Sequence, residues 1–561
     1  MRLLFYFMFI WSIFLVSSYP SRFDKNFKFS SAEVHDLIKN KKWTCKDILK
    51  YFIDRAVKYD PTIKSIISYN PKAFERAQQL DEFYAENGKL IGELHCVPVI
   101  IKDNIDIQGI PTTAGVNAMR NMVPNKNALV IDRMNQKGAV FLAKANMAQL
   151  AAGIIFSSEQ VGLCNNPYNL NRTCSASSSG SGASIAAGFA VVSLGTDTGG
   201  SIIGPASSMA VWGYRPPHQS EVLDGILPLE SNADTVGPMA KNLDDLILTH
   251  SVIYNIPTLY KNIVQQSFDK NALKVRIITN FIDGFKVDKY NFVIDPLVKN
   301  LIQESINRMK SLGIQIEEKT LNESQLKEFA AKFDDLIRKY NPCILGCVAF
   351  NYNNYFGDKF RYESDSPIRN TKQFYQNDLL SSVWKSQINA SGWNLDKLDD
   401  LSYTNQVCDQ FCQESKKARD LFKNFITNYL IDDKIDALFV PSLTTIVPFH
   451  NELATVLKEG EYNTFSVLSV QTGYGYIVMP SGFTPSTKTD PDGIPFAMAL
   501  IHLPQKTENA FKIAKLYELN KSFNKLPHTV PLLNVLNNCE KLNGKLMEII
   551  AFQLFLKFLI F

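Results

Sequence analysis

A stretch rich in serine and glycine, from residue 172 to 208, holds the side chains best suited to chemistry. Its small hydroxyl residues lead into an apolar run, Ile185 to Leu194, which ends in the glycine-rich segment Gly195 to Ser201. A flexible linker does not carry a ten-residue apolar segment. We therefore expect a loop, a buried helix or strand, and a tight glycine turn that presents Ser201. Backbone N–H groups of such a turn point at a bound oxygen, as in an oxyanion hole.

This stretch resembles the signature of the amidase signature family of serine hydrolases, which includes the fatty acid amide hydrolases. Residues 175–181 resemble the family's Gly-Gly-Ser-Ser-Gly-Gly-Ser, and residues 195–203 its Gly-Thr-Asp-x-Gly-Gly-Ser-Ile-Arg. Residues 98–104 match its upstream Pro-Val-x-x-Lys-Asp-Asn. Three motifs in the family's order make the resemblance specific. It extends over residues 30–525, with a poorly matching segment from 320 to 440.

Carried over position by position, the resemblance implies a Ser-Ser-Lys triad. Ser201 matches the nucleophile, Ser177 the bridging serine behind a cis peptide bond with Ala176, and Lys102 the base. The resemblance also implies an oxyanion hole made by the backbone N–H groups of Thr198, Gly199, Gly200 and Ser201. The implied reaction is hydrolysis of a carboxylic amide, including a fatty acid amide, through an acyl-enzyme intermediate.

The proposed base makes chemical sense only if Lys102 is buried. A serine hydroxyl is a weak nucleophile and needs a neighbouring base. A free lysine has a pKa of about 10.4, so keeping it neutral near pH 7 requires a decrease of about 3 units, or roughly 4 kcal/mol. The apolar residues 97–101 just before Lys102 predict the burial that lowers a lysine pKa.

Several positions depart from the family pattern. Ser175, Ala176 and Ser179 replace glycines, and each adds a Cβ to a tight loop. Ile203 replaces an arginine, which removes a positive charge near the site. Two alternatives therefore stay open: a catalytically impaired, secreted binding protein on the same fold, and an A-type amidotransferase subunit that supplies ammonia to an aminoacyl-tRNA.

The flanking elements predict an α/β fold. Residues 30–92 show helical spacing, 138–144 read as a buried strand, and 273–318 as strand, helix and strand. We expect a single large domain over residues 30–525, with a mixed, twisted β-sheet covered by helices on both faces. Lys144 is expected to be a surface charge at a strand end.

The chain carries 59 basic and 55 acidic residues, a net charge of +4, without a basic stripe, so nucleic acid is not an expected partner. We expect a small-molecule amide as substrate; the sequence leaves the oligomeric state open. No Walker loop, dinucleotide fingerprint or metal motif occurs, so no cofactor or metal is expected.

Residues 1–18 carry one positive charge followed by an apolar run and small residues, which is typical of a secretory signal peptide. An uncleaved N-terminal anchor is the alternative, and either one places the protein in the secretory pathway, secreted or lumenal. Residues 526–561 form a C-terminal extension whose apolar end is too short to span a bilayer. It either contacts a membrane surface, which we slightly favour, docks into the core or serves as a GPI signal.

Nine cysteines occur, so at least one is unpaired or joins another chain. Cys343 and Cys347, like Cys408 and Cys412, share a face if their segments are helical. Disulfides or buried thiols are favoured over a zinc site, because the spacing is uncommon for zinc. Cys96 replaces a family glycine near the lysine motif and is expected to be a small buried residue.

Overall fold

The computed structural model describes residues 29–531, apart from 154–155, 289, 359–360, 363–366, 391–392, 453–464, 522 and 524. The expected signal peptide and most of the expected C-terminal extension lie outside the described residues. Within the part of the chain that is described, no helix combines the length and the apolar character needed to cross a membrane.

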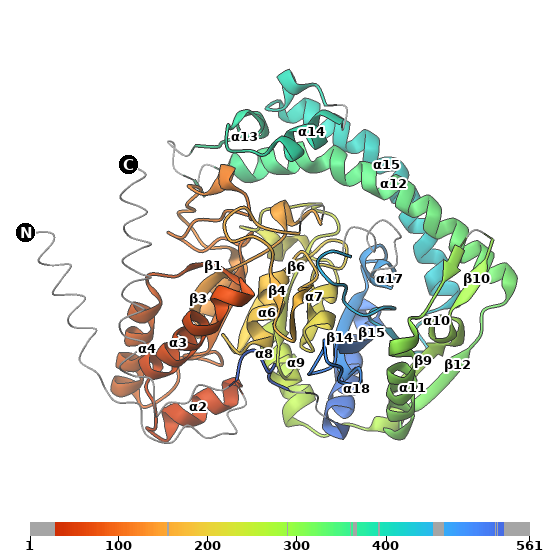
Figure 1. Ribbon diagram of the computed structural model, residues 1–561, viewed down its shortest axis with the longest axis horizontal. Coiled ribbons are helices and arrows are strands. Elements are labelled where there is room, and N and C mark those ends of the chain that lie inside the picture. Colours follow the sequence, from red (N-terminus) through yellow and green to blue (C-terminus); the bar gives the residue numbers. More distant parts are fainter. Residues whose placement is uncertain are drawn as a thin grey trace, which may run out of the picture.

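An eleven-stranded mixed sheet forms the centre of the molecule, in the order β1-β3-β2-β6-β8-β7-β14-β15-β13-β9-β12 (Figure 1). Strand β2 is parallel to both of its neighbours, β3 and β6. Strand β9 is likewise parallel to both of its neighbours, β13 and β12. The remaining neighbouring pairs in the sheet are antiparallel. The sheet strands are β1 Ile66–Tyr69, β2 Pro98–Lys102, β3 Val140–Ala145, β6 Val192–Asp197, β7 Trp212–Arg215, β8 Thr235–Ala240, β9 Lys274–Ile278, β12 Gln315–Lys319, β13 Ala437–Pro441, β14 Gly475–Phe483 and β15 Pro495–His502. Two small hairpins are β4 Asn165–Asn166 with β5 Asn169–Thr173, and β10 Phe285–Val287 with β11 Tyr290–Phe292.

Helices cover both faces of this sheet. They are α2 Ser31–Lys39, α3 Cys45–Ile63, α4 Ala73–Asn87, α5 Leu129–Gln136, α6 Ser179–Ala186, α7 Ile203–Ser208, α8 Leu243–Ile253, α9 Pro257–Tyr260, α10 Thr279–Asp283, α11 Pro296–Ser311, α12 Glu323–Phe356, α13 Thr371–Gln376, α14 Ser382–Ala390, α15 Leu401–Tyr429, α17 Ser466–Val470 and α18 Thr507–Asn520. Alternate side chains of β15 enter two different apolar clusters, one shared with α6 and the other with α18. This two-residue alternation is the pattern of a strand covered on both faces, and it confirms the expected α/β class.

Lys144 does not lie at the surface, as the sequence analysis expected. It lies on β3, which is an inner strand between β1 and β2, and its side chain is only 1% exposed. Its ammonium group lies 3.0 Å from the buried carboxylate of Asp103, the residue that follows Lys102. The charge is therefore paired inside the protein, as a buried charge must be.

Four disulfides join eight of the nine cysteines, and Cys539 lies outside the described residues. The bonds are Cys45–Cys96, Cys164–Cys174, Cys343–Cys412 and Cys347–Cys408. Cys96 is thus bonded rather than a free thiol, and its φ of +62° explains why a glycine suits this position in the family. Two of these bonds join the long helices α12 and α15, which run side by side along one side of the molecule (Figure 1).

Candidate active site

Three segments meet at one edge of the sheet. Strands β2 and β6 are parallel neighbours, with Ile101 opposite Leu194, so their carboxyl ends lie next to each other. Lys102 is the last residue of β2, and the glycine turn follows directly after β6. The loop before α6 brings Ser177 to the same place, because Ser178 N–H donates to the backbone oxygen of Ser201, 3.1 Å away.

Lys102 is enclosed by hydroxyl and carbonyl groups. Its Nζ lies 2.8 Å from Ser177 Oγ, 2.8 Å from Thr196 Oγ1 and 3.1 Å from the carbonyl oxygen of Thr196. Burial of the side chain lowers the pKa of Lys102 to about 7, although the negative charges of Asp197 and Asp234 act in the opposite direction. A lysine with this pKa is neutral in a large fraction of molecules near pH 7, as a general base must be.

The loop that carries Ser177 keeps an unusual backbone. The peptide bond between Ala176 and Ser177 is cis, as the resemblance implied. Ser175, which replaces a family glycine, has a φ of +60° and a buried hydroxyl group without a hydrogen-bond partner among the described residues. Ser179 starts helix α6 and is buried. The extra Cβ atoms are therefore accommodated in this loop, with a left-handed conformation at Ser175.

Ser201 is the member of this group that faces outward. It is partly exposed just before α7, whereas Ser177 and Lys102 are fully buried. Gly199, two residues earlier, is exposed, and a Cβ built at this position would meet no atom within 4 Å. The turn is therefore open to solvent at Gly199.

The glycine turn is shaped by the buried carboxylate of Asp197. This carboxylate accepts hydrogen bonds from the N–H groups of Gly200 (2.8 Å), Ile202 (2.7 Å) and Ile203 (3.3 Å). The N–H of Gly200, one of the four implied for the oxyanion hole, is thus directed at Asp197 in this structure. The candidates for binding an oxyanion are then the N–H groups of Thr198, Gly199 and Ser201.

A positive charge is present near the turn, although Ile203 replaces the family's arginine. Arg215, at the end of β7, places its Nε 3.1 Å from Asp197 Oδ1, and both side chains are fully buried. Its other nitrogens donate to the carbonyl oxygens of Ala233 (2.9 Å) and Tyr474 (3.4 Å). The carboxylate of Asp197 is therefore paired with a buried cation from another strand, although position 203 carries no charge.

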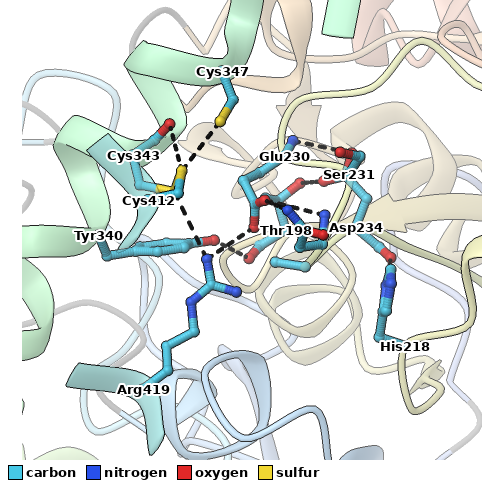
Figure 2. A network of polar contacts seen from close by, with 12 residues as sticks. Thr198, His218, Glu230, Ser231, Asp234, Tyr340, Cys343, Cys347, Cys412 and Arg419 are labelled. Atoms are coloured by element: carbon cyan, nitrogen blue, oxygen red, sulfur yellow. Dashed lines mark hydrogen bonds and ion pairs between the residues drawn. A yellow bond between two sulfur atoms is a disulfide. The ribbon is translucent and has the colours of Figure 1, made fainter. Parts of the chain in front are cut away.

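A second buried carboxylate, that of Asp234, holds Thr198. Its oxygens accept hydrogen bonds from the Thr198 hydroxyl and from the N–H groups of Leu229 and Glu230, at 2.8 and 3.1 Å (Figure 2). Burial raises the pKa of Asp234 to about 7. The turn is thus held from one end by Asp197 and at Thr198 by Asp234.

Sequence reasoning missed the roles of Thr196, Asp197, Arg215 and Asp234 in this site. Thr196 and Asp197 lie within the motif at residues 195–203, which does not show which of its side chains hold the turn. Arg215 and Asp234 lie outside the three motifs. A separate surface cavity, lined by Asn70, Arg76, Gln108 and others, contains none of the residues discussed above.

Comparison with known proteins shows which protein family this fold and these signature segments belong to. The mixed-sheet α/β fold and the three signature segments are those of an amidase-type hydrolase. The family model described as Amidase matches residues 47–508, so the chain belongs to the amidase signature family.

Relatives and solved structures agree with this membership. The chain is 26% identical to the A-type subunit of a glutamyl-tRNA(Gln) amidotransferase from Heliobacterium modesticaldum, over 87% of this chain and 95% of the relative. It is 27% identical to the subunit of the same name from Carboxydothermus hydrogenoformans, over 88% and 98%. The native peptide amidase from Stenotrophomonas maltophilia shares the fold, with a TM-score of 0.68, 20% identity and coverage of 90% of this chain and 99% of that one.

Proposed function

We propose that this chain hydrolyses a carboxylic amide through a Ser-Ser-Lys triad formed by Ser201, Ser177 and Lys102. The observation that carries the proposal is the 2.8 Å separation of Lys102 Nζ and Ser177 Oγ in a fully buried setting that lowers the lysine pKa to about 7. A base of this kind activates a serine hydroxyl without a histidine.

In the proposed reaction, neutral Lys102 takes a proton from Ser177 while Ser177 takes one from Ser201. The Ser201 oxygen attacks the amide carbonyl carbon, and backbone N–H groups of the turn bind the resulting oxyanion. Ser177 then gives a proton to the leaving nitrogen and regains one from the Lys102 ammonium, so that the C–N bond breaks, the amine or ammonia departs and Lys102 is neutral again. Water, activated in the same way, hydrolyses the acyl-enzyme to the acid.

An A-type amidotransferase subunit is the second candidate. The relatives quoted above carry that name and are matched over 95–98% of their length, which favours this alternative over a fatty acid amide hydrolase. Both candidates begin with the same attack on an amide and differ in the fate of the ammonia. The four disulfides favour a secreted or lumenal protein, because such bonds persist in oxidising compartments. An amide-hydrolysing enzyme fits that setting better than an enzyme that modifies tRNA.

The first test is labelling of the purified protein by a fluorophosphonate, which reacts with activated serines. We expect Ser201→Ala to abolish labelling and Lys102→Ala to slow it strongly. Ser305→Ala is the control, because it removes a buried serine hydroxyl from α11, bonded to Leu301 O at 2.6 Å. Labelling of folded Ser201→Ala at the native rate contradicts the proposal, and absence of labelling in the folded native protein favours the catalytically impaired binding protein.

A substrate panel then separates the remaining candidates. Ammonia release is measured from glutamine, from a peptide with a C-terminal amide and from a long-chain fatty acid amide. Turnover of any of these by the chain alone identifies an amidase. Fluorophosphonate labelling without turnover, restored by added amidotransferase partner proteins and glutamyl-tRNA, identifies the amidotransferase component.

A further inference from the structure

The long helix α12 reaches the glycine turn that precedes Ser201. Tyr340 lies on α12, is only 5% exposed, and donates a hydrogen bond from its hydroxyl group to the carbonyl oxygen of Thr198, 3.2 Å away (Figure 2). Burial raises the pKa of Tyr340, so the hydroxyl keeps its proton and remains a donor. This contact comes from the segment 320–440, which resembles the family least.

The acceptor of this bond shares a peptide unit with the N–H of Gly199. A trans peptide unit is planar, and its C=O and N–H groups point in opposite directions. A donor that fixes the Thr198 carbonyl oxygen therefore also fixes the direction of the Gly199 N–H. It also polarises the amide, which strengthens the N–H as a donor.

Gly199 is the glycine of the turn whose N–H matters for an oxyanion. The N–H of Gly200 is already donated to Asp197. Gly199 is exposed beside Ser201, whereas the Thr198 carbonyl group faces the buried hydroxyl of Tyr340. The Gly199 N–H is thus placed on the side open to a substrate.

Disulfides hold the helix face that carries Tyr340. Residues 340, 343 and 347 follow one another at intervals of three and four, so they share one face of α12. Cys343 is bonded to Cys412 and Cys347 to Cys408, both on α15. The first of these bonds lies one helical turn from Tyr340.

An arginine of α15 packs on the same tyrosine. The Arg419 guanidinium lies 5.1 Å from the centre of the Tyr340 ring, and its Nη2 lies 3.2 Å from the buried carboxylate of Glu230. Glu230 belongs to the loop that also contains Asp234, and its N–H donates to the same carboxylate that accepts the hydrogen bond of the Thr198 hydroxyl. Tyr340 is thus contacted by Arg419 of α15 at its ring and by Thr198 of the core at its hydroxyl group (Figure 2).

We propose that Tyr340 is a positioning residue that orients the Gly199 N–H toward the oxyanion, and that the disulfide-bonded pair α12–α15 holds it there. The inference rests on the proposed function, because it requires an acyl-transfer reaction at Ser201. It assigns a role in catalysis to a helical pair outside the three signature motifs.

Tyr340→Phe tests the inference, because it removes one hydroxyl group and leaves the ring. Loss of a bond that supports an oxyanion donor is expected to lower kcat and the fluorophosphonate labelling rate by about 5- to 10-fold. KM is expected to stay within about twofold, because the native protein and Tyr340→Phe make the same contacts with the bound substrate in its ground state. Affinity for a trifluoromethyl ketone, which forms a tetrahedral adduct with an active serine, is expected to fall by the same factor as kcat/KM. Tyr168→Phe is the matched control, since it removes a buried hydroxyl that donates to another backbone carbonyl, Lys525 O, at 2.9 Å.

The double variant Cys343→Ser/Cys412→Ser is a second, independent test. Without the disulfide nearest Tyr340, kcat and ketone affinity are expected to fall in the same direction. Combining this change with Tyr340→Phe is expected to add little, because both act through one contact. This variant also keeps the inference testable if Tyr340→Phe does not fold.

The outcomes separate this inference from the function on which it rests. If the native protein is labelled at Ser201 and Tyr340→Phe keeps native kcat and ketone affinity, the inference alone is overturned. A rise in KM with unchanged kcat also overturns it, because it would make Tyr340 a substrate contact. If the folded native protein is not labelled at Ser201, the proposed function fails and the inference fails with it.

Discussion

Replacing Arg215 tests whether its buried charge maintains the turn that precedes Ser201. In Arg215→Met, the carboxylate of Asp197 loses its cation but stays fully buried. Removing one partner of a buried ion pair costs about 3–5 kcal/mol, because the other charge is left uncompensated. Asp197 keeps hydrogen bonds from Gly200, Ile202 and Ile203, so we expect a loss of about 3 kcal/mol in the free energy of unfolding.

An effect on activity is expected in addition to the effect on folding. Arg215 Nε and Gly200 N–H share one acceptor, Asp197 Oδ1, so a shift of this oxygen moves the turn directly. We expect the fluorophosphonate labelling rate of the folded protein to fall at least about 10-fold, because displacing one oxyanion donor weakens transition-state binding. Arg215→Lys keeps the positive charge but not the three donor nitrogens of the guanidinium group. We therefore expect its labelling rate to lie between those of the native protein and Arg215→Met.

The assay combines chemical denaturation with labelling under conditions in which every variant is folded. Arg361→Met is the control, because it breaks an ion pair with Asp106 that is about as deeply buried (2% and 0% exposed, 3.0 Å), along with the more exposed pairs to Asp224 and Asp358. We expect this control to lose stability to a similar degree and to keep its labelling rate per folded molecule. Native-rate labelling of Arg215→Met, or equal losses in both variants, would refute the role assigned to Arg215.

Four further predictions concern titration and backbone strain. Because neutral Lys102 is the active form and its pKa is about 7, kcat/KM is expected to rise with pH through an apparent pKa near 7; a flat profile between about pH 6 and 8.5 would contradict this. The negative charge of Asp234 raises the pKa of Lys102, so Asp234→Asn is expected to shift that rise to lower pH, whereas an unchanged profile would show that this charge does not act on the lysine. The folded-state pKa of Lys102 lies below its unfolded value of 10.5, so the unfolded chain binds more protons between pH 7 and 10.5; the stability of the native protein relative to Lys102→Met is therefore expected to rise with pH over that window, by about 5 kcal/mol in total, as measured by urea titration. Ser175→Gly removes both a left-handed serine and a buried hydroxyl without a partner among the described residues, so it is expected to raise stability by about 1 kcal/mol with labelling unchanged, and a loss of stability would mean that the serine is favourable in this loop.

The part of the site that could be predicted from the sequence is the part encoded in contiguous motifs. The lysine strand, the serine loop and the glycine turn each have a local signature, and the neighbouring parallel strands β2 and β6 bring them together. Helix α11 and its flanking strands were also predictable, because apolar periodicity is a local property.

The missing parts are contacts between segments distant in the chain. Arg215 meets Asp197 because β7 and β6 both flank β8 in the sheet, which no spacing in the sequence reveals. The prediction for Lys144 was wrong for the same reason: its strand is internal, and its partner Asp103 lies 41 residues earlier. Eight cysteines allow 105 pairings, so the disulfides between α12 and α15 follow from helix packing and not from the cysteine pattern alone.

The departures from the family pattern argue less strongly for a non-catalytic relative once they are placed in the structure. Ser175 adopts the left-handed backbone that a glycine would adopt, so the loop keeps its path despite the added Cβ. Although position 203 carries no charge, Arg215 pairs with the carboxylate that shapes the turn. A chain that had lost its chemistry would have no need to keep a lysine fully buried against a serine, since burial of an uncompensated lysine is costly. Lysine burial alone does not mark a catalytic site, because Lys241 is also buried and its pKa is also lowered to about 7. The argument for catalysis is the combination of a buried Lys102 with Ser177 Oγ 2.8 Å from its Nζ.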